Sequence, residues 1–593
     1  MPSLIEELKR RRVFRAVVGY GVIVFTALQI IEPIMHAFHW PDSVLTYAVT
    51  ALAVGFPAVV VLAWIFDLNA GRIERAAPAP SLRGVRLWLL LAGVGALCAA
   101  PGLAWYFFLH APPSSSAQAR EERPRPTAEN TQPLTAPSLP PSIAVLPFAD
   151  MSAAKDQEYF ADGLAEELLG LLAKVPGLKV TGRTSSFAFK GKNDDLRAIA
   201  QKLGVAHILE GSVRKSGEQL RITTQLVSAS DGYELWSETY DRKLTDVFAV
   251  QDEIASAVVS ALKMKLLPAS GEKPRGTDNI EAYNQVLLGR QFRTRGTLED
   301  TARARQAFQR ATQLDPDYAA AWAGLSRATF ALADKTVSKT EAEAGFAQAK
   351  EEAGKAILIG PEVASGYVAR GIGRAIRDWN WAGADEDFQR ALALEPDNSE
   401  ALTAYAVYLL QALGRSAEEL TLLRRVTELD PLSSTAWSML GWALLLSGDQ
   451  RAAQQAIARA LELAPSSSAA EHNLASSLIL EGRPRDALGV LPRTIGVFAL
   501  QGAALAQHSL GHRQESTRAL EELIAEDAAG AAFQISEVYA WRGENDKAFE
   551  WLLRARAQRD TGIGLLKSSA FLRGLHGDPR WNTLLASVNL PVG

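Results

Sequence analysis

The stretch PLSSTAWSMLGWALLLSGDQRAAQQAIARALELAP, residues 431–465, contains two apolar-patterned segments separated by a Gly-Asp turn. The first segment carries apolar residues at helical spacing: Trp437, Leu440, Gly441 and Leu444. The second carries a small-large-small pattern and a closing proline: Ala453, Ile457, Ala460 and Pro465. Small residues let paired helices approach, the large residue fills the gap, and proline ends the second helix. The stretch therefore predicts a helical hairpin.

The same pattern recurs along the second half of the chain. Prolines close five successive blocks: Pro316, Pro361, Pro396, Pro431 and Pro465. Their spacings of 45, 35, 35 and 34 residues approach the 34-residue period of the tetratricopeptide repeat. We predict an all-α solenoid of such repeats over 278–593, with seven or eight helix pairs, an insertion near 334–344 and a capping helix near Asp578–Val588.

Stacked helix pairs form a superhelix with a concave binding surface. We expect six side chains of the first helices to face this groove and contact a partner: Arg327, Tyr408, Gln411, Trp442, His472 and Glu537. Aromatic residues are favoured binding anchors, although Tyr408 and Trp442 can equally fill space between repeats. Residues 1–110 carry nine basic and six acidic side chains and 111–141 are balanced, so the total of −4 leaves about −7 on 142–593. This charge favours neutral or basic protein or peptide partners over nucleic acid.

Upstream of the repeats, residues 142–265 alternate between strand and helix patterns. The expected strands are 142–148, 178–181, 206–215, 219–228 and 233–242, and the expected helices are 158–175, 194–203 and 246–264. Asp194 is placed to cap its helix, and Ser216-Gly217 and Asp231-Gly232 are typical hairpin turns. The order predicts an α/β domain with a mixed sheet covered by helices.

The stretches SIAVLPFADMSAAKDQEYFADGLAEELLGLLAKVPGLKVTGRTSSFAFKG (142–191) and AHILEGSVRKSGEQLRITTQLVSASDGYELWSETYDR (206–242) resemble the TolB-amino-terminal-like domain of bacterial membrane and envelope proteins. The resemblance implies a position between a membrane anchor and tetratricopeptide repeats. ELKRRRVFRAVVGYGVIVFTALQI and GFPAVVVLAWIFDL resemble the anchors of that architecture. Some relatives carry a cytoplasmic nucleotide cyclase or winged-helix domain. Only about a dozen residues precede the first apolar run here, so we expect neither.

The first 110 residues predict a membrane anchor. Three apolar runs, 13–31, 43–66 and 87–109, each have about 20 residues, which is the length of a helix that crosses roughly 30 Å of hydrocarbon. Residues 111–141 hold eight of the 28 prolines and predict a disordered linker. Ala92, Ala96 and Ala100 favour close helix packing, within the anchor or with a second copy.

Basic residues set the predicted orientation. Lys9 to Arg12 precede the first run, four arginines lie between the second and third runs, and residues 32–42 contain no Lys or Arg. Segments rich in Lys and Arg next to a membrane span stay on the cytoplasmic side. We therefore expect an inner-membrane protein with a cytoplasmic N-terminus and with residues 110–593 in the periplasm.

The sequence contains no recognisable catalytic motif. Its one cysteine, Cys98, excludes an intrachain disulfide framework and a Cys-based zinc site. We expect no enzyme activity, no cofactor and no metal. The sequence leaves the role of two local motifs undecided. Asp162-Gly163 with Glu166-Glu167 is either a partner-contacting patch or helix-start chemistry, and Arg183–Phe187 is a candidate anion-binding loop.

The leading hypothesis is a membrane-tethered periplasmic scaffold or assembly factor that binds proteins or peptides through the repeat groove. The alternative is a transmembrane sensor or regulator that relays binding outside to another membrane or cytoplasmic partner.

Overall fold

The computed structural model describes residues 66–69, 72–75, 141–192, 194–262, 264, 276–336, 338–491, 494 and 496–592. The chain divides into two compact units, Met1–Pro133 and Leu134–Gly593. In the first unit the described residues form an antiparallel pair, β1 (Phe66–Asn69) and β2 (Arg72–Arg75). Phe66, predicted as the last residue of the second span, instead begins β1, where the polar Asp67 ends the apolar run.

The predicted membrane segments fall almost wholly outside the described residues. This holds for 13–31, for 43–66 apart from Phe66, for 87–109, and for the linker 111–141 apart from Pro141. Among the residues that are described, none of the helices is both long enough and apolar enough to cross a bilayer.

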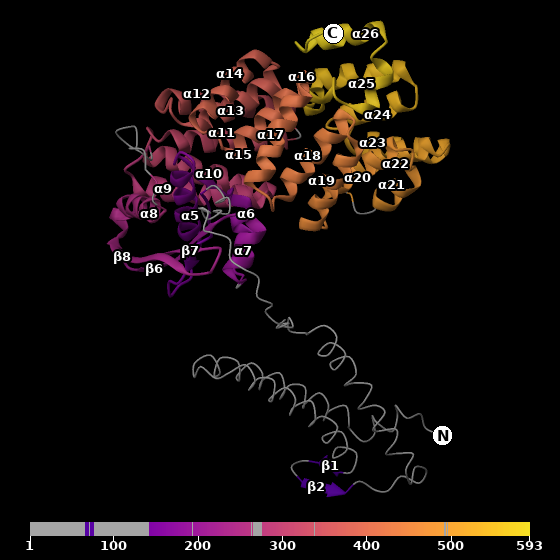
Figure 1. Ribbon diagram of the computed structural model, residues 1–593. Coiled ribbons are helices and arrows are strands. Elements are labelled where there is room, and N and C mark those ends of the chain that lie inside the picture. Colours follow the sequence, from indigo (N-terminus) through magenta and orange to yellow (C-terminus); the bar gives the residue numbers. More distant parts are fainter. Residues whose placement is uncertain are drawn as a thin grey trace, which may run out of the picture. The chain divides into compact units, whose positions relative to one another are not determined.

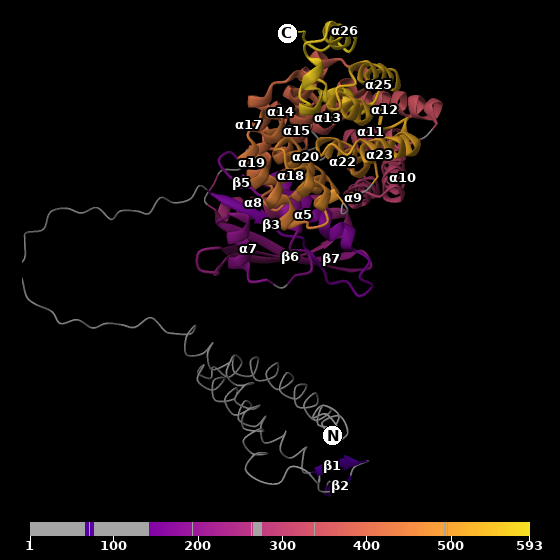
Figure 2. The same ribbon diagram turned by 90° about the vertical axis from the view of Figure 1, so that its right-hand side faces the viewer.

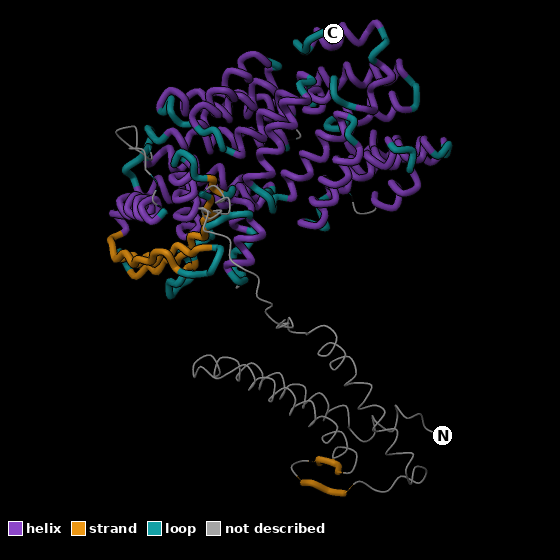
Figure 3. Tube along the Cα trace, viewed as in Figure 1, coloured by secondary structure: helices purple, strands orange, loops and turns teal. Residues whose placement is uncertain are grey.

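A mixed sheet forms the α/β part of the second unit (Figures 1 and 3). Its strands are β3 (Ser142–Val145), β4 (Ala149–Asp150), β5 (Lys179–Val180), β6 (His207–Ser216), β7 (Gln219–Ser228) and β8 (Glu234–Lys243). The order is β5-β3-β6-β7-β8, and β4 also pairs with β6. β3 runs parallel to β5 and β6, whereas β6, β7 and β8 are antiparallel. The predicted mixed sheet is confirmed.

Helices cover both faces of this sheet. They are α5 (Glu158–Ala173), α6 (Arg183–Phe187), α7 (Leu196–Leu203) and α8 (Val247–Ala261). α5 and α8 share a core with Leu220 and Leu226 of β7, and α7 packs on the other face with Ile208. The cap of α7 differs from the prediction. Asp195 accepts from the Arg197 amide, whereas Asp194 lies one residue too early and instead pairs with Lys202.

The rest of the second unit is helical. Its helices are α9 (Ile280–Arg295), α10 (Leu298–Leu314), α11 (Ala319–Asp334), α12 (Lys339–Ile359), α13 (Ala364–Gly373), α14 (Trp381–Leu394), α15 (Ser399–Tyr405), α16 (Gln411–Leu413), α17 (Ser416–Leu429), α18 (Ser434–Ser447), α19 (Gln450–Leu463), α20 (Ser468–Leu480), α21 (Pro484–Val490), α22 (Val497–Ser509), α23 (Arg513–Asp527), α24 (Ala532–Trp541) and α25 (Asn545–Gln558). Two π-helical turns interrupt first helices: η2 (Arg374–Asp378) after α13, and η3 (Ala406–Leu410) between α15 and α16. The described part of the array contains eight consecutive helix pairs.

The repeat pattern explains the packing. Each of the five prolines stands two residues beyond the end of a helix, as Pro465 does after Leu463. In α10, α14 and α19 the large residue, Phe308, Phe388 or Ile457, is buried between small ones, and a Cβ at Gly441 would lie 2.7 Å from Ile457. The predicted insertion near 334–344 does not form an extra loop. It lengthens α12 to 21 residues, against 14 in α14, because this Ala- and Glu-rich segment favours helix.

The C-terminal segment returns to the middle of the array. It comprises the 3₁₀ turns η5 (Thr561–Leu565) and η6 (Ala570–Leu575) and the helix α26 (Pro579–Ser587). α26 lies within the range of the predicted capping helix, Asp578–Val588, and the Asp578 side chain caps it by accepting from the Arg580 amide. The segment does more than cover the last pair. The indole N–H of Trp381 donates to the Val588 carbonyl at 2.9 Å. One hydrophobic core joins residues of the third pair with residues of the eighth pair and of α26 (α13, α14, α25 and α26 in Figure 2).

Several polar contacts dock the α/β domain on the array, and two of them involve the motifs left open above. Glu167 of α5 pairs with Arg290 of α9 at 2.8 Å. The Ser185 amide donates to the Asp430 carboxylate at 2.8 Å, and burial raises the pKa of that carboxyl. Both motifs that the sequence left open thus make contacts within the chain. The acidic patch contacts the array, and the candidate anion loop already holds a carboxylate of the same chain.

Candidate binding pocket of the helical array

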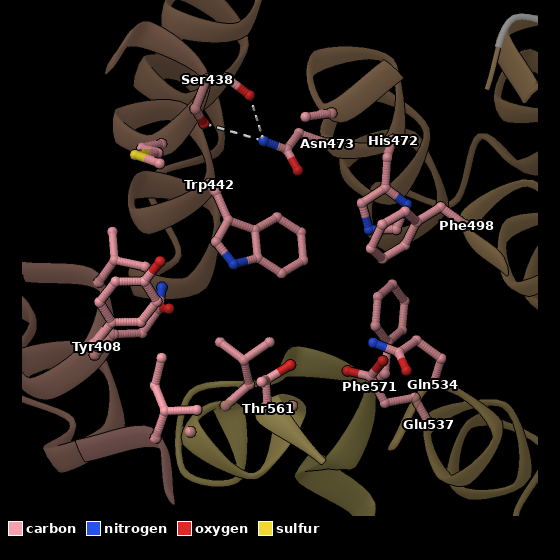
Figure 4. Close-up of a pocket in the computed structure, with 18 of the residues that line it drawn as sticks. Tyr408, Ser438, Trp442, His472, Asn473, Phe498, Gln534, Glu537, Thr561 and Phe571 are labelled. Atoms are coloured by element: carbon pink, nitrogen blue, oxygen red, sulfur yellow. Dashed lines mark hydrogen bonds between the residues drawn. The ribbon is translucent and has the colours of Figure 1, made fainter. Parts of the chain in front are cut away.

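The first helices of the later pairs line a pocket of about 370 Å³ on the inner side of the superhelix. Side chains from η2, η3, α16, α18, α20, α22 and α24, together with Trp379 and Trp381, form three of its sides, and η5 and η6 close the fourth. In Figure 4, Trp442 projects into the pocket, with Tyr408 on one side and His472 and Phe498 on the other. The return of the C-terminal segment therefore turns an open groove into a walled pocket.

Five of the six side chains predicted to face a partner line this pocket: Tyr408, Gln411, Trp442, His472 and Glu537. Arg327 lies elsewhere, because its helix α11 belongs to the second pair. Its guanidinium pairs with Glu400 at 2.7 Å, as does that of Arg293. Burial opposes ionisation of Glu400, but the two arginines hold its pKa well below the usual range. Arg327 is thus committed to an ion pair inside the array.

Aromatic rings form the wall of the pocket. The His472 ring lies between Trp442, at a centroid distance of 5.8 Å, and Phe498, at 4.5 Å. Burial lowers the pKa of His472 to about 4, so the imidazole is neutral near pH 7. Tyr408 and Phe498 remain 39% and 42% exposed, which is high for large apolar side chains on a concave wall. This wall offers apolar contact area that the described residues of the array do not cover.

Buried polar groups form the floor. The Glu537 carboxylate accepts from Ser569 at 2.5 Å and from the Gln501 amide at 2.6 Å, and it is 5% exposed. Burial raises the pKa of Glu537 to about 7, although both hydrogen bonds act to lower it. Three floor and wall atoms are buried without a hydrogen-bond partner within the described residues: Oε1 of Gln501, Oε1 of Gln534 and Nδ1 of His472. These three atoms have hydrogen-bonding capacity that the described residues leave unused.

Gln411 lies mostly behind the wall of the pocket, and little of its side chain is exposed. Its amide donates to Glu419 at 3.0 Å, and only 4% of the residue is exposed. Burial raises the pKa of Glu419 to about 8, so this pair is close to neutral. The sequence placed Gln411 on the correct face but not at its true depth.

Sequence reasoning missed the residues that close the pocket, including Phe571 and Thr561. The sequence predicted a capping helix near Asp578–Val588, but no local pattern shows that Val588 reaches Trp381, 207 residues away. It also missed the π-helical turn η3, which carries Tyr408. Such turns arise from one inserted residue and are frequent at functional sites. No group of three or more potential metal ligands occurs within the described ranges.

Comparisons with known proteins identify two regions. Residues 434–467 match the tetratricopeptide repeat, and residues 139–257 match the second domain of HilA/YgeH-like transcriptional regulators. The array is therefore a tetratricopeptide-repeat region, a type of region that binds proteins and peptides. "Putative adenylate cyclase 3" of Rhizobium meliloti (strain 1021) is 45% identical over 194 residues, covering 32% of this chain and 33% of that protein. The chain thus matches about a third of the length of this curated relative.

Two solved structures are similar to part of the chain. The type IV pilus biogenesis factor PilW is 21% identical and covers 34% of this chain and 93% of its own, with a TM-score of 0.29. A thermophilic tetratricopeptide-repeat protein of Thermus thermophilus is 19% identical and covers 33% of this chain and 99% of its own, with a TM-score of 0.28.

Proposed function

We propose that this chain is a membrane-tethered, periplasmic interaction scaffold that holds a segment of a partner protein in the pocket of its repeat array. The observation that carries the proposal is the exposed aromatic wall, where Tyr408, Trp442 and Phe498 surround about 370 Å³. Aromatic side chains in a partly desolvated pocket are typical binding hot spots. A volume of this size accommodates a few side chains of a peptide.

The chemistry of the pocket limits its ligand. The wall is apolar, His472 is neutral, and the unpartnered atoms of Gln501 and Gln534 are carbonyl oxygens that accept hydrogen bonds. These features favour a segment with an apolar or aromatic side chain and an amide or ammonium donor. The acidic balance of residues 142–593 favours a neutral or basic segment in the same way.

Site-specific photocrosslinking in intact cells tests this proposal. A benzophenone amino acid at Phe498 should capture a discrete partner, whereas the same probe at Leu553, which is 50% exposed and outside the pocket, should not. Adding Trp442→Ala should reduce the Phe498 adduct about tenfold or more, as expected for loss of a hot-spot aromatic. Equal capture at both positions, or an adduct that Trp442→Ala leaves unchanged, would refute a partner in the pocket.

The tether and the compartment belong to this proposal. They are supported by the three apolar runs, by the basic residues before the first run, and by the four arginines between the second and third runs. Reporter fusions after residues 110 and 593 test them, and alkaline phosphatase activity at both positions is expected. Activity of a cytoplasmic reporter at both positions would reverse the orientation. The resemblance of residues 142–242 to TolB-amino-terminal-like domains supports an envelope location.

We also propose that the chain binds without catalysing a reaction. In the pocket, the Glu537 carboxylate is held by Ser569 and Gln501, and the His472 ring lies between two aromatic rings. The Ser569 hydroxyl that donates to Glu537 is buried, with only 2% of the residue exposed. Incubating the purified chain with ATP should yield no cyclic AMP, and production of cyclic AMP would overturn this part of the proposal.

The second candidate is a signalling or regulatory protein. It is favoured by the match of residues 139–257 to a transcriptional-regulator domain and by the partial similarity to "Putative adenylate cyclase 3". The contacts that dock the α/β domain on the array, Glu167–Arg290 and Ser185–Asp430, would transmit a change in one to the other. Replacing residues 1–110 by an unrelated single-span anchor separates the candidates, because a scaffold keeps its function and a transducer loses it.

A further inference from the structure

A second cavity, of about 320 Å³, lies where the third helix pair meets the end of α25. Its polar lining is mainly basic, with five Lys and Arg side chains and two acidic ones: Lys350, Arg370, Arg374, Arg377, Arg559, Glu343 and Asp378. A cavity with this balance is suited to an anion.

Three of the five basic groups already have carboxylate partners. Lys350 pairs with Asp378 at 2.7 Å. Arg370 and Arg374 share Asp387, at 2.7 and 2.9 Å. These three cations are therefore largely neutralised by the chain itself.

Arg377 and Arg559 are different, because no ion pair joins either guanidinium to a carboxylate within the described part of the chain. Each instead donates to the backbone carbonyl of the other, at 3.1 and 2.5 Å. Burial and the charge of Arg559 lower the pKa of Arg377, although Asp334, Glu343 and Asp378 act in the opposite direction at longer range. Two like charges are thus held together.

Aromatic rings fix the orientation of both side chains. The Arg377 guanidinium lies 3.9 Å from the centroid of Phe346, and that of Arg559 lies 4.1 Å from the centroid of Trp379. A stacked guanidinium keeps its edge free, and each arginine has five N–H donors, of which one is used here. The remaining donors form a preorganised fork for an oxyanion.

The backbone at this junction is strained. Trp379 and Arg559 have φ values of 50° and 57°, a region that costs about 1–2 kcal/mol for a residue other than glycine. Glycine or asparagine would close these helices at lower cost. The chain therefore accepts strain at the two residues whose side chains stack on each other. Such strain is typical of sites where a side chain is needed.

We propose that Arg377 and Arg559 bind a dianionic oxyanion, of the phosphate or sulfate class, in this cavity. Two unneutralised guanidinium groups match a double negative charge better than a single carboxylate. The bound anion would bridge η2 of the third pair and the end of α25, and so fasten the return of the C-terminal segment. This site is distinct from the aromatic pocket and does not depend on the function proposed for it.

Thermal unfolding of the purified full-length chain tests the proposal. At constant ionic strength, sodium phosphate and sodium sulfate should raise the melting temperature relative to chloride, because a ligand of the folded state stabilises it. Sodium acetate should have little effect. Calorimetric titration with phosphate then gives the affinity. An equal rise in melting temperature with acetate and with phosphate would refute a dianion site. No rise with phosphate, sulfate or acetate would show that the two arginines bind water and no anion.

Substitutions assign the effect to the two arginines. Arg377→Gln and Arg559→Gln should each weaken phosphate binding about tenfold or more, since each removes charge-assisted hydrogen bonds. Arg554→Gln is the matched control, because Arg554 lies on the same helix and stacks on Trp551 at 4.6 Å, outside the cavity. The Arg554→Gln variant should bind phosphate as tightly as the wild type does.

The variants Arg377→Lys and Arg559→Lys test whether weaker phosphate binding results from a loss of folding. They keep the charge, and circular dichroism should show native helicity. They should bind phosphate more weakly than the wild type but better than the Gln variants. Folded Gln variants that bind phosphate as the wild type does would overturn the proposal.

Discussion

Single residues in the aromatic pocket have opposite responses to pH. Burial raises the pKa of Glu537 to about 7 and lowers that of His472 to about 4. The folded state holds the Glu537 proton more tightly than the unfolded chain does, so this contribution to stability is full below about pH 4.5 and is lost as the pH rises through 7. The His472 contribution is full above about pH 6.5 and is lost as the pH falls towards 4. The two partly cancel in the wild type.

The substitution Glu537→Gln should separate the contribution of Glu537 to the pH dependence of stability from that of His472. The amide can accept from Gln501 and donate to the Ser569 hydroxyl, so the floor stays hydrogen-bonded. The variant should resemble the wild type in stability at about pH 4.5 and exceed it by on the order of 2–3 kcal/mol above pH 7. Urea unfolding at several pH values measures this difference.

Glu544→Gln is the control. Although burial acts to raise it, the pKa of Glu544 is lowered overall by Lys547 and Arg542, so this variant should lose stability relative to the wild type at neutral pH and approach it in acid. If the stability difference between Glu537→Gln and the wild type is the same at every pH, Glu537 is not protonated in the folded state near neutrality.

At the scale of helices and strands, the sequence was most informative where the pattern is local. The five prolines and the small-large-small triplets follow from spacing, and the structure has them as predicted. Asp195 replaced Asp194 as a cap because caps depend on backbone angles that spacing leaves open by one residue. The π-helical turns η2 and η3 have no sequence signature. The pocket face was predictable, whereas its depth and its closed fourth side depend on contacts distant in sequence.

Two glycines of α13 should respond oppositely to alanine. A Cβ at Gly371 would lie 2.9 Å from the buried Phe388 ring, so Gly371→Ala should destabilise the chain by roughly 1–3 kcal/mol. At Gly373 the backbone is helical and no atom lies within 4 Å of a new Cβ. Gly373→Ala should therefore stabilise by up to about 1 kcal/mol, through helix propensity. Thermal unfolding compares the two, and the same sign for both would refute the close packing of α13 on α14.

At the scale of the whole molecule, the repeats and the α/β domain act on each other through buried polar contacts. Asp430→Ala would leave the Ser185 amide without its acceptor and should cost about 1–3 kcal/mol. Asp430→Asn keeps an acceptor oxygen and should cost less. Asp397→Ala removes an exposed pair with Arg425 and should cost about 1 kcal/mol at most. Hydrogen exchange in β5 and α6 should rise in Asp430→Ala alone. Unchanged exchange there would show that this contact does not hold the domain.

The return of the C-terminal segment is the feature that sets the extent of the cooperative unit. Removing residues 577–593 takes away the Val588 carbonyl that accepts from Trp381 and the Asn589 amide that donates to the Trp379 carbonyl. It also uncovers core residues shared between the third and the eighth pair.

Solenoids normally couple only neighbouring repeats, so an open array would respond to this truncation near α25 alone. A closed array should lose hydrogen-exchange protection in α13 and α14 as well, about 200 residues earlier in the chain, while α9 and α10 keep theirs. The truncated chain should also yield less of the Phe498 photocrosslink, because η5 and η6 form the fourth side of the pocket and are themselves held by this core. Protection of α13 and α14 equal to that of the full chain would mean that the two ends touch without stabilising each other, and the pocket would then be an ordinary open groove.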